Sequence, residues 1–276
     1  MKIPFVKMHG LSNDFVIIDA RGNISVPDLS QLSALTRRKT GIGCDQLGLI
    51  YAPTDERADI FIRFLNAPDA TEIEACGNMS RCVAWLIMEE MGRNELVIQT
   101  IADHLICTRQ NSRDTRITVD FGVPKLNWQD IPLAEARDTL HLDIGDKGVQ
   151  DPVGVNVGNP HAVFFVEDCE TLDLQTIGPR FENHPLFPRK ANIEFATILD
   201  RHNIRMRVWE RDTGETVACG SGACATHVAA VRRGYTAPES TIMLDGGELD
   251  FTWREENGRC YMTGDTAFVF EGQIVF

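Results

Sequence analysis

The sequence predicts an α/β fold, of the α+β kind, built from two pseudo-symmetric domains that each wrap strands around a central helix. Three observations predict it. A cysteine stands before an apolar, helix-like segment at Cys76 and again at Cys219. Polar residues recur at a nearly constant offset between the two halves. Finally, the apolar segment 83–88 is hydrophobic enough to be buried on most sides of a helix.

The offset between the halves can be checked at four pairs of positions. The pairs are Asn13 and Asn159, Gln46 and Asn192, Asn66 and Glu210, and Cys76 and Cys219, which are 146, 146, 144 and 143 residues apart. Such regular spacing indicates an internal repeat. Each repeat would have roughly 120 to 145 residues, a common domain size.

Composition narrows the class of protein. The 276 residues are 43% hydrophobic and 24% charged, which is typical of a globular chain. No apolar run reaches the ~18 residues of a membrane span, and the N-terminal residues 1–5 show no secretory pattern. We therefore expect a cytoplasmic protein with no membrane partner. The net charge of −13 argues against nucleic acid as a partner.

The elements of the first half follow from its apolar runs. Residues 5–19 read as strand, turn, strand, and leucines at helical spacing predict a short helix over 27–39. Further strands are expected at 47–51, 60–66, 96–100, 104–109 and 116–121. The residues from 125 to 137 read as a loose connection, so we place a domain boundary after residue 121.

The second half repeats this order. Residues 153–165 are again strand, polar turn, strand, and a helix-like stretch follows near 172–177. Residues 191–195 correspond to the region of Gln46, and residues 204–210 to the strand at 60–66. The second domain is then expected to cover 122–265.

The position of the two cysteines suggests their chemistry. A thiol at the start of a helix faces the positive end of the helix dipole, which favours the thiolate. Two thiols on opposite sides of one carbon can remove a proton from one face and deliver a proton to the other. The backbone amides of Gly77, Asn78, Gly220 and Ser221 would hold the carboxylate on that carbon. This chemistry requires no cofactor and no metal.

A series of motifs runs in order along essentially the full length of the chain: Lys7-Met8-His9-Gly10, Asn13-Asp14-Phe15, Gly41-Ile42-Gly43, Asp45-Gln46, Cys76-Gly77-Asn78, Arg81-Cys82, Gly158-Asn159-Pro160-His161, Ala191-Asn192-Ile193, Glu210-Arg211, Gly214-Glu215-Thr216, Ala218-Cys219-Gly220-Ser221-Gly222-Ala223 and Met262-Thr263-Gly264. In these motifs the chain resembles the diaminopimelate epimerase family.

The resemblance implies both a fold and a reaction. Each domain is expected to be a curved, mostly antiparallel sheet around a central helix, with the active site in the cleft between the domains. The last strand is expected to return to the first domain, which then covers 1–121 plus 266–276. The implied reaction is the pyridoxal-independent interconversion of LL- and meso-diaminopimelate, in lysine and peptidoglycan precursor biosynthesis. A homodimer is a further family-level expectation.

The resemblance also implies roles for individual residues. Cys76 and Cys219 are the two bases. His161 supports proton transfer at Cys76, and Glu210 supports it at Cys219. The substrate, a diamino dicarboxylate, is held at its distal end by Asn66, Asn159, Asn192 and Arg211. Its reacting end is lined by Asn13, Gln46 and Glu210. The sequence departs from the family pattern at Met79 and Asp212, where a small residue and a glycine are usual, and its 66–76 loop is one residue longer.

Other interpretations remain open at the level of sequence. His161 could be a satisfied core histidine, Glu210 an ordinary carboxylate at a strand end, and each asparagine a turn former. We expect the other six cysteines to be buried hydrophobes. Cys76, Cys82, Cys219 and Cys224 could form a metal module, but their Cys-x5-Cys and Cys-x4-Cys spacings are poor for zinc. A thiol redox sensor that closes a Cys76–Cys219 disulfide, or a racemase for a proline-type substrate, are further alternatives.

Overall fold

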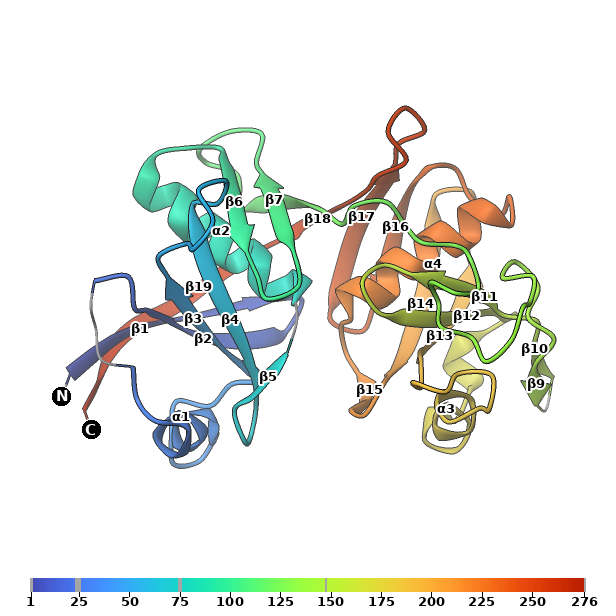
Figure 1. Ribbon diagram of the computed structural model, residues 1–276, viewed down its shortest axis with the longest axis horizontal. Helices are drawn as coiled ribbons and strands as arrows, with labels where there is room; N and C mark the ends of the chain where they lie inside the picture. The colour runs from blue at the N-terminus through green and yellow to red at the C-terminus, as the bar shows by residue number, and fades with distance from the viewer. Residues whose placement is uncertain (1, 23–25, 74–75, 147, 276) are drawn as a thin grey trace. The chain divides into compact units, whose positions relative to one another are not determined.

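The computed structural model describes residues 2–22, 26–73, 76–146 and 148–275. The chain divides into two compact units (Figure 1). Unit 1 comprises Met1–Val119 and Gly264–Phe276, and unit 2 comprises Asp120–Thr263. Ala75, part of the first cysteine motif, lies outside the described residues.

Unit 1 is a mixed sheet around one long helix. Its strands are β1 (Lys2–Gly10), β2 (Asn13–Asp19), β3 (Gln46–Tyr51), β4 (Ile60–Asn66), β5 (Thr71–Ile73), β6 (Glu95–Gln99), β7 (His104–Thr108), β8 (Arg116–Asp120) and β19 (Ala267–Val275). They pair in the order β19-β1-β2-β3-β4-β6-β7-β8, with β5 also on β4. The pairs β2–β3 and β4–β6 are parallel and the others antiparallel.

The helices of unit 1 begin and end where the local sequence requires. Helix α1 (Leu29–Thr36) starts with a capping box, in which Asp28 and Gln31 accept hydrogen bonds from each other's backbone N–H groups. Helix α2 (Gly77–Met91) ends at Gly92, whose left-handed conformation suits glycine. Its residues Val83, Ala84, Ile87 and Met88 are buried, and it packs on β1, β2, β6 and β7.

Unit 2 has the same plan. Its strands are β9 (Gly145–Asp146), β10 (Val149–Gln150), β11 (Val153–Asn156), β12 (Pro160–Phe165), β13 (Asn192–Ile198), β14 (Asn203–Glu210), β15 (Gly214–Thr216), β16 (Glu239–Leu244), β17 (Gly247–Trp253) and β18 (Cys260–Asp265). Its helices are the 3-10 turn η1 (Cys169–Thr171), α3 (Leu174–Glu182) and α4 (Gly220–Arg232). Helix α4 is buried along most of its length against β11–β14, β16 and β17.

The pairing order demonstrates the internal repeat. Unit 2 pairs as β11-β12-β13-β14-β16-β17-β18 with β15 on β14, and its parallel pairs are β12–β13 and β14–β16. Strand by strand this is the order and the direction seen from β1 to β8. The repeat predicted from four polar offsets is therefore confirmed as a repeat of topology, and the predicted α+β fold with a central helix in each half is confirmed.

Two helices differ from their predicted bounds. The helix expected over 27–39 is only α1 (Leu29–Thr36), because Asp28 is its cap and Arg37 already has an extended backbone. The helix expected near 172–177 extends as α3 to Glu182, with Pro179 inside it. The connection predicted at 125–137 contains neither helix nor strand, apart from one bridge between Lys125 and Asn156. No helix in the described part of the chain is long and apolar enough to cross a membrane.

Candidate active site

Cys76 and Cys219 occupy the same structural position in their units. Cys76 is the N-cap of α2, and its Sγ accepts a hydrogen bond of 3.4 Å from the backbone N–H of Met79. Cys219 is the N-cap of α4, and its Sγ accepts one of 3.4 Å from the N–H of Gly222. Both residues have extended backbones. A thiol that caps a helix in this way interacts with its positive end, which stabilises a thiolate.

The helix starts also provide backbone donors. Gly77 and Asn78 are the first residues of α2, and Gly220 and Ser221 are the first of α4. The first-turn N–H groups of a helix have no partner within the helix, so they are suited to hold an anion. The four residues predicted to bind a carboxylate thus lie where such binding is physically favourable.

In unit 1 the predicted carboxamides gather at one edge of the sheet. Asn13 begins β2, Gln46 begins β3 and Asn66 ends the antiparallel strand β4, so the register places all three at the same edge. The Nδ2 group of Asn78 donates to Oδ1 of Asn13 at 3.4 Å, which links this edge to the start of α2.

Gln46 has spare hydrogen-bonding capacity. Its Nε2 group donates to Oδ1 of Asn66 at 2.8 Å. Its Oε1 atom is buried and has no hydrogen-bond partner in the described part of the chain. A buried, unsatisfied acceptor is costly. This oxygen is therefore well placed to accept a hydrogen bond from a ligand.

In unit 2 a continuous chain of polar contacts leads to Cys219. The ring of His161 lies between Glu194, at 2.7 Å from Nδ1, and Asn159, whose Oδ1 is 2.8 Å from Nε2. Nδ2 of Asn159 donates to Oγ of Ser221 at 3.4 Å, and Ser221 Oγ lies 3.5 Å from Cys219 Sγ. Both nitrogens of the buried His161 are thus occupied within unit 2.

The surroundings of Cys219 favour protonated groups. Burial raises the pKa of Cys219 well above its usual value, and the nearby Glu210 and Glu194 raise it further. Burial also raises the pKa of Glu194, against the effect of His161. The pKa of Glu210 is likewise raised by burial, although its hydrogen bonds with Thr216 and Cys219 oppose this. Cys219 therefore lies among groups able to retain a proton.

Asn192 fixes the backbone around Arg211. Its Nδ2 donates to the carbonyl of Pro160 at 3.0 Å, and its Oδ1 accepts from the Arg211 N–H at 2.9 Å. The next residue, Asp212, has a φ of 58°, which explains why glycine suits this position. Here the aspartate is held by an ion pair with Lys190 and by its N–H, which donates to Glu182 at 2.9 Å.

Glu194 is a further residue of this site that was not predicted from the sequence. Its carboxylate is fully buried on β13, and Oε2 has no hydrogen-bond partner among the described residues. A Cβ on Gly222 would lie 2.8 Å from Glu194 Oε1, so glycine at 222 lets this carboxylate approach the start of α4. An acidic residue between Ile193 and Phe195 was the available signal, since buried strands seldom contain an unpaired charge.

In unit 1 the glycine lies on the strand and the larger side chain lies on the helix. Gly48 and Met79 occupy the positions equivalent to Glu194 and Gly222. A Cβ on Gly48 would lie 2.7 Å from Sδ of Met79, which is fully buried. The space beneath the cysteine-capped helix is therefore filled by a neutral thioether in unit 1 and by a carboxyl group in unit 2. This explains how Met79 replaces the small residue usual in the family.

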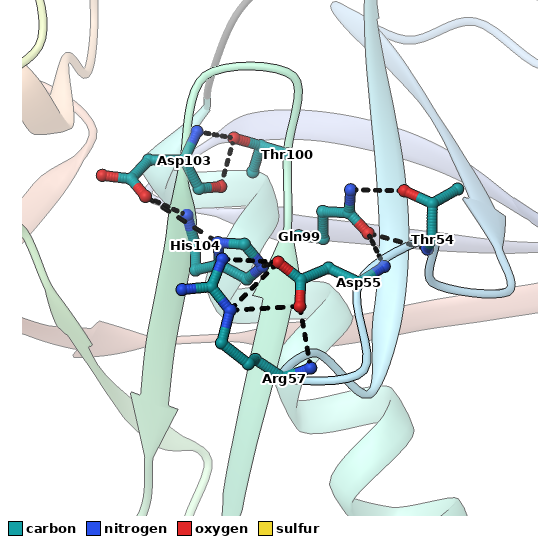
Figure 2. Close-up of polar contacts among 7 residues, drawn as sticks. All are labelled: Thr54, Asp55, Arg57, Gln99, Thr100, Asp103 and His104. Carbon is teal, nitrogen blue, oxygen red and sulfur yellow. Dashed lines mark hydrogen bonds and ion pairs between the residues drawn. The ribbon is translucent and has the colours of Figure 1, made fainter.

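A second polar cluster of unit 1 is self-contained (Figure 2). The β3–β4 loop carries Asp55, which pairs with Arg57 and lies 3.2 Å from His104 Nε2. Gln99 binds Thr54 through both ends of its carboxamide. This cluster lies at the end of β3 and β4 opposite to Gln46 and Asn66, and it fixes a loop.

The six cysteines expected to be buried hydrophobes are all buried: Cys44, Cys82, Cys107, Cys169, Cys224 and Cys260. Burial raises the pKa of Cys44 and of Cys82 to about 12. Cys76, in contrast, is half-buried.

Solved structures share this fold. A phenazine biosynthesis protein of the PhzF family from Bacillus anthracis has a TM-score of 0.70 and 14% identity, with 100% of both chains covered. A hydroxyproline epimerase from Agrobacterium vitis, with bound trans-4-hydroxy-L-proline, has a TM-score of 0.68 and 14% identity over 99% of this chain and 92% of its own. The chain therefore shares its fold with a PhzF-family protein and with an epimerase of hydroxyproline.

Sequence comparison assigns the family. The model of the diaminopimelate epimerase family matches residues 5–127 and 153–269. The diaminopimelate epimerase of Rhodospirillum centenum is 48% identical over 98% of this chain and 91% of its own. The diaminopimelate epimerase of Acidiphilium cryptum is 49% identical over 98% of this chain and 96% of its own. The chain belongs to the diaminopimelate epimerase family, as the sequence motifs predicted.

Proposed function

We propose that this isomerase converts LL-2,6-diaminopimelate to meso-diaminopimelate by two-base proton transfer at one α-carbon. Close relatives that cover nearly the whole chain are named for this reaction. The observation that carries the mechanism is the equivalence of Cys76 and Cys219, which cap corresponding helices of a repeated fold. Two units that each supply one thiol suit an inversion in which one face loses a proton and the other gains one.

The thiolate of one cysteine takes the α-proton and becomes a thiol, while the electron pair of the C–H bond moves into the carboxylate as an enediolate. The opposite thiol then donates its proton to the other face of the carbon and becomes a thiolate. The backbone donors at Gly77, Asn78, Gly220 and Ser221 stabilise the enediolate charge. No other reactant is consumed.

The remaining predicted residues hold the substrate in this proposal. Asn13, Gln46 and Glu210 line the reacting end, and the distal ammonium and carboxylate bind Asn66, Asn159, Asn192 and Arg211. Glu210 retains a proton near Cys219, and His161 supports proton transfer at Cys76 as a member of the buried pair with Glu194. In this proposal the chain has two domains, 1–121 plus 266–276 and 122–265, and each supplies one of the two cysteines.

We also propose a cytoplasmic homodimer that works without pyridoxal phosphate or another cofactor. A reducing compartment suits a chain with eight cysteines, since the two reactive thiols would otherwise oxidise. Exposed apolar side chains on β19, at Phe268, Val269, Phe270 and Val275, support a self-association surface. The dimer is tested by comparing the sedimentation of wild type with that of F268D/F270D. A monomeric wild type contradicts the dimer.

The reaction is tested by solvent exchange. Reduced protein is incubated with LL-diaminopimelate in D2O, and the α-deuterium of the product is measured by mass spectrometry. We expect exchange in wild type and in C169A, a buried-cysteine control, and its loss in both C76A and C219A. Absence of exchange in wild type, or exchange of L-proline in place of diaminopimelate, would contradict the proposal.

A further inference from the structure

Arg81 is a buried cation near the start of α2. Its side chain is fully buried, and it is the largest fully buried side chain of the described residues. Its Nη2 group donates to Oδ1 of Asn78 at 3.0 Å. This bond turns the amino group of Asn78 toward Asn13, to which it donates at 3.4 Å. The guanidinium thus determines which way the Asn78 carboxamide points.

The guanidinium is also fixed from the side of the sheet. A Cβ on Gly10, at the end of β1, would lie 3.2 Å from Nη2 of Arg81 and 3.6 Å from Cβ of Asn78. Any larger residue at position 10 would have to displace one of these groups. The close approach of β1 holds Arg81 in place, and it gives the Lys7-Met8-His9-Gly10 motif a structural reason for its glycine.

Thiol groups and a carboxyl group face the charge of Arg81. Burial lowers the pKa of Arg81, and charge on Cys82, Cys76, Asp265 or Cys107 opposes this effect. Even so, an arginine remains protonated at physiological pH. Cys82 and Cys107 are fully buried, and Asp265 is exposed to solvent, which screens its charge. Cys76 is therefore the accessible thiol that can gain most from the buried cation.

The equivalent region of unit 2 has the opposite electrostatic character. Cys224 occupies the position that corresponds to Arg81, and the carboxyl group of Glu194 occupies the position of Gly48. Helix α2 thus has a buried positive charge near its capping thiol, and helix α4 has a buried acidic group. A repeated fold with equivalent thiols therefore surrounds them with different charges.

We propose that Arg81 is a positioning residue that orients the Asn78 carboxamide toward Asn13 and, through its buried charge, keeps Cys76 as the thiolate. The inference deepens the proposed function, because it assigns the resting base to Cys76. It concerns unit 1 alone.

The test measures the ionisation of Cys76 directly. In a C219A background, the rate of alkylation of Cys76 by iodoacetamide is followed against pH, with the modified residue identified by mass spectrometry. R81Q removes the charge but keeps a donor for Asn78, and R81K keeps the charge but loses the planar fork. R109Q is the matched control, because Arg109 is a buried arginine of the same unit that contacts Glu89, Asn94 and Arg93 instead.

We expect R81Q to raise the alkylation midpoint by roughly one pH unit, so that alkylation at a pH well below the midpoint is about tenfold slower. R81K and R109Q should retain the wild-type midpoint. In the enzyme with both cysteines, R81K should raise KM for diaminopimelate several-fold, because Asn78 is no longer fixed. An unchanged midpoint in R81Q, or an equal rise in R109Q, overturns the proposal.

If R81Q fails to fold, the proposal can still be tested on a protein in which Arg81 is intact. In the C219A protein with Arg81 intact, the Cys76 midpoint should lie below that of the same protein unfolded in urea. A folded midpoint at or above the unfolded one refutes the role of Arg81. Since alkylation needs no substrate, these outcomes are independent of the deuterium-exchange result.

Discussion

Glu194 and His161 form a fully buried pair, with Oε1 of the carboxyl group 2.7 Å from Nδ1 of the ring. Oδ1 of Asn159 can only accept a hydrogen bond, so Nε2 of His161 carries a hydrogen. One further proton is then shared between Nδ1 and Oε1, either on the ring or on the carboxyl group. Because burial disfavours the ionised carboxylate and raises its pKa, the pair can hold a proton without a net charge.

The first prediction concerns this shared proton. In E194Q the amide can still fill the space and donate to Nδ1, but it cannot exchange a proton with the ring. We expect kcat for diaminopimelate exchange to fall by about 100-fold, the lower end of the usual range for proton-transfer groups, with little change in KM. Steady-state kinetics and the pH profile of kcat provide the measurement.

The variant D250N is the control for E194Q, because it also replaces a carboxyl group by an amide. Asp250 accepts a hydrogen bond of 2.7 Å from Thr241 on the neighbouring strand of unit 2 and is not part of the predicted site. D250N should lower the melting temperature and leave kcat within about twofold, as expected for a half-exposed structural bond. Equal losses of kcat in E194Q and D250N would show that Glu194 is only structural.

A second prediction follows from the environment of Cys219. Its pKa is raised by burial, by Glu210 and by Glu194, so it should remain a thiol at neutral pH. In C76A, the alkylation midpoint of Cys219 should lie above that of an unfolded cysteine, near pH ~8.5. The pH midpoint is the informative quantity, since the low exposure of Cys219 slows alkylation at every pH. A midpoint below that of Cys76 in C219A would reverse the assignment of the resting thiolate.

The sequence was sufficient for the repeat because its polar positions and cysteine motifs keep their spacing. It also placed Cys76 and Cys219 at helix starts, since glycine and serine follow them and an apolar run comes next. In unit 2 the strand residue Glu194 lies against Gly222 of the helix, whereas in unit 1 the strand residue Gly48 lies against Met79 of the helix. This difference between the two units was not predictable. It depends on which strand residue lies beneath the helix, and that is set by packing.

Arg81 and His227 illustrate the same limit. Both are polar residues within helices whose neighbours are apolar, and the sequence does not state how deeply each is buried. Burial depends on close approaches such as that of Gly10 to Arg81, made by residues 71 positions apart along the chain. Local pattern predicts an element and its buried face, whereas the partner of a buried charge comes from tertiary structure.

A third prediction tests the unsatisfied oxygen of Gln46. Q46M keeps the length of the side chain but removes both the bond to Asn66 and the free acceptor. We expect KM for diaminopimelate to rise roughly tenfold, in line with the loss of one or two hydrogen bonds to a substrate. Q99M is the control, because among the described residues the side chain of Gln99 bonds to Thr54 and Asp55 of the loop cluster in Figure 2 and lies far from Gln46 along the strands. A similar KM in wild type and Q46M would exclude Gln46 from the binding site.

The fourth prediction concerns acid stability and the buried His227 on α4. Its Nδ1 lies 2.7 Å from Oγ of Ser240, and its ring stacks on Phe251 at 5.5 Å between centroids. Nε2 is buried without a hydrogen-bond partner in the described part of the chain. Burial lowers the pKa of His227 to about 4, so the folded protein strongly prefers the neutral ring.

Protonation of His227 therefore opposes folding. The unfolded histidine titrates near pH ~6.5, so its stabilising contribution is complete above that value and is lost as the pH falls toward 4. Between pH 7 and pH 5 we expect this residue to remove about 2 kcal/mol from the free energy of unfolding. H227Q should lack this part of the pH dependence, while H202Q, a change at an exposed histidine, should retain it. Urea denaturation at both pH values decides the matter: parallel losses in wild type and H227Q would mean that other groups cause the acid sensitivity.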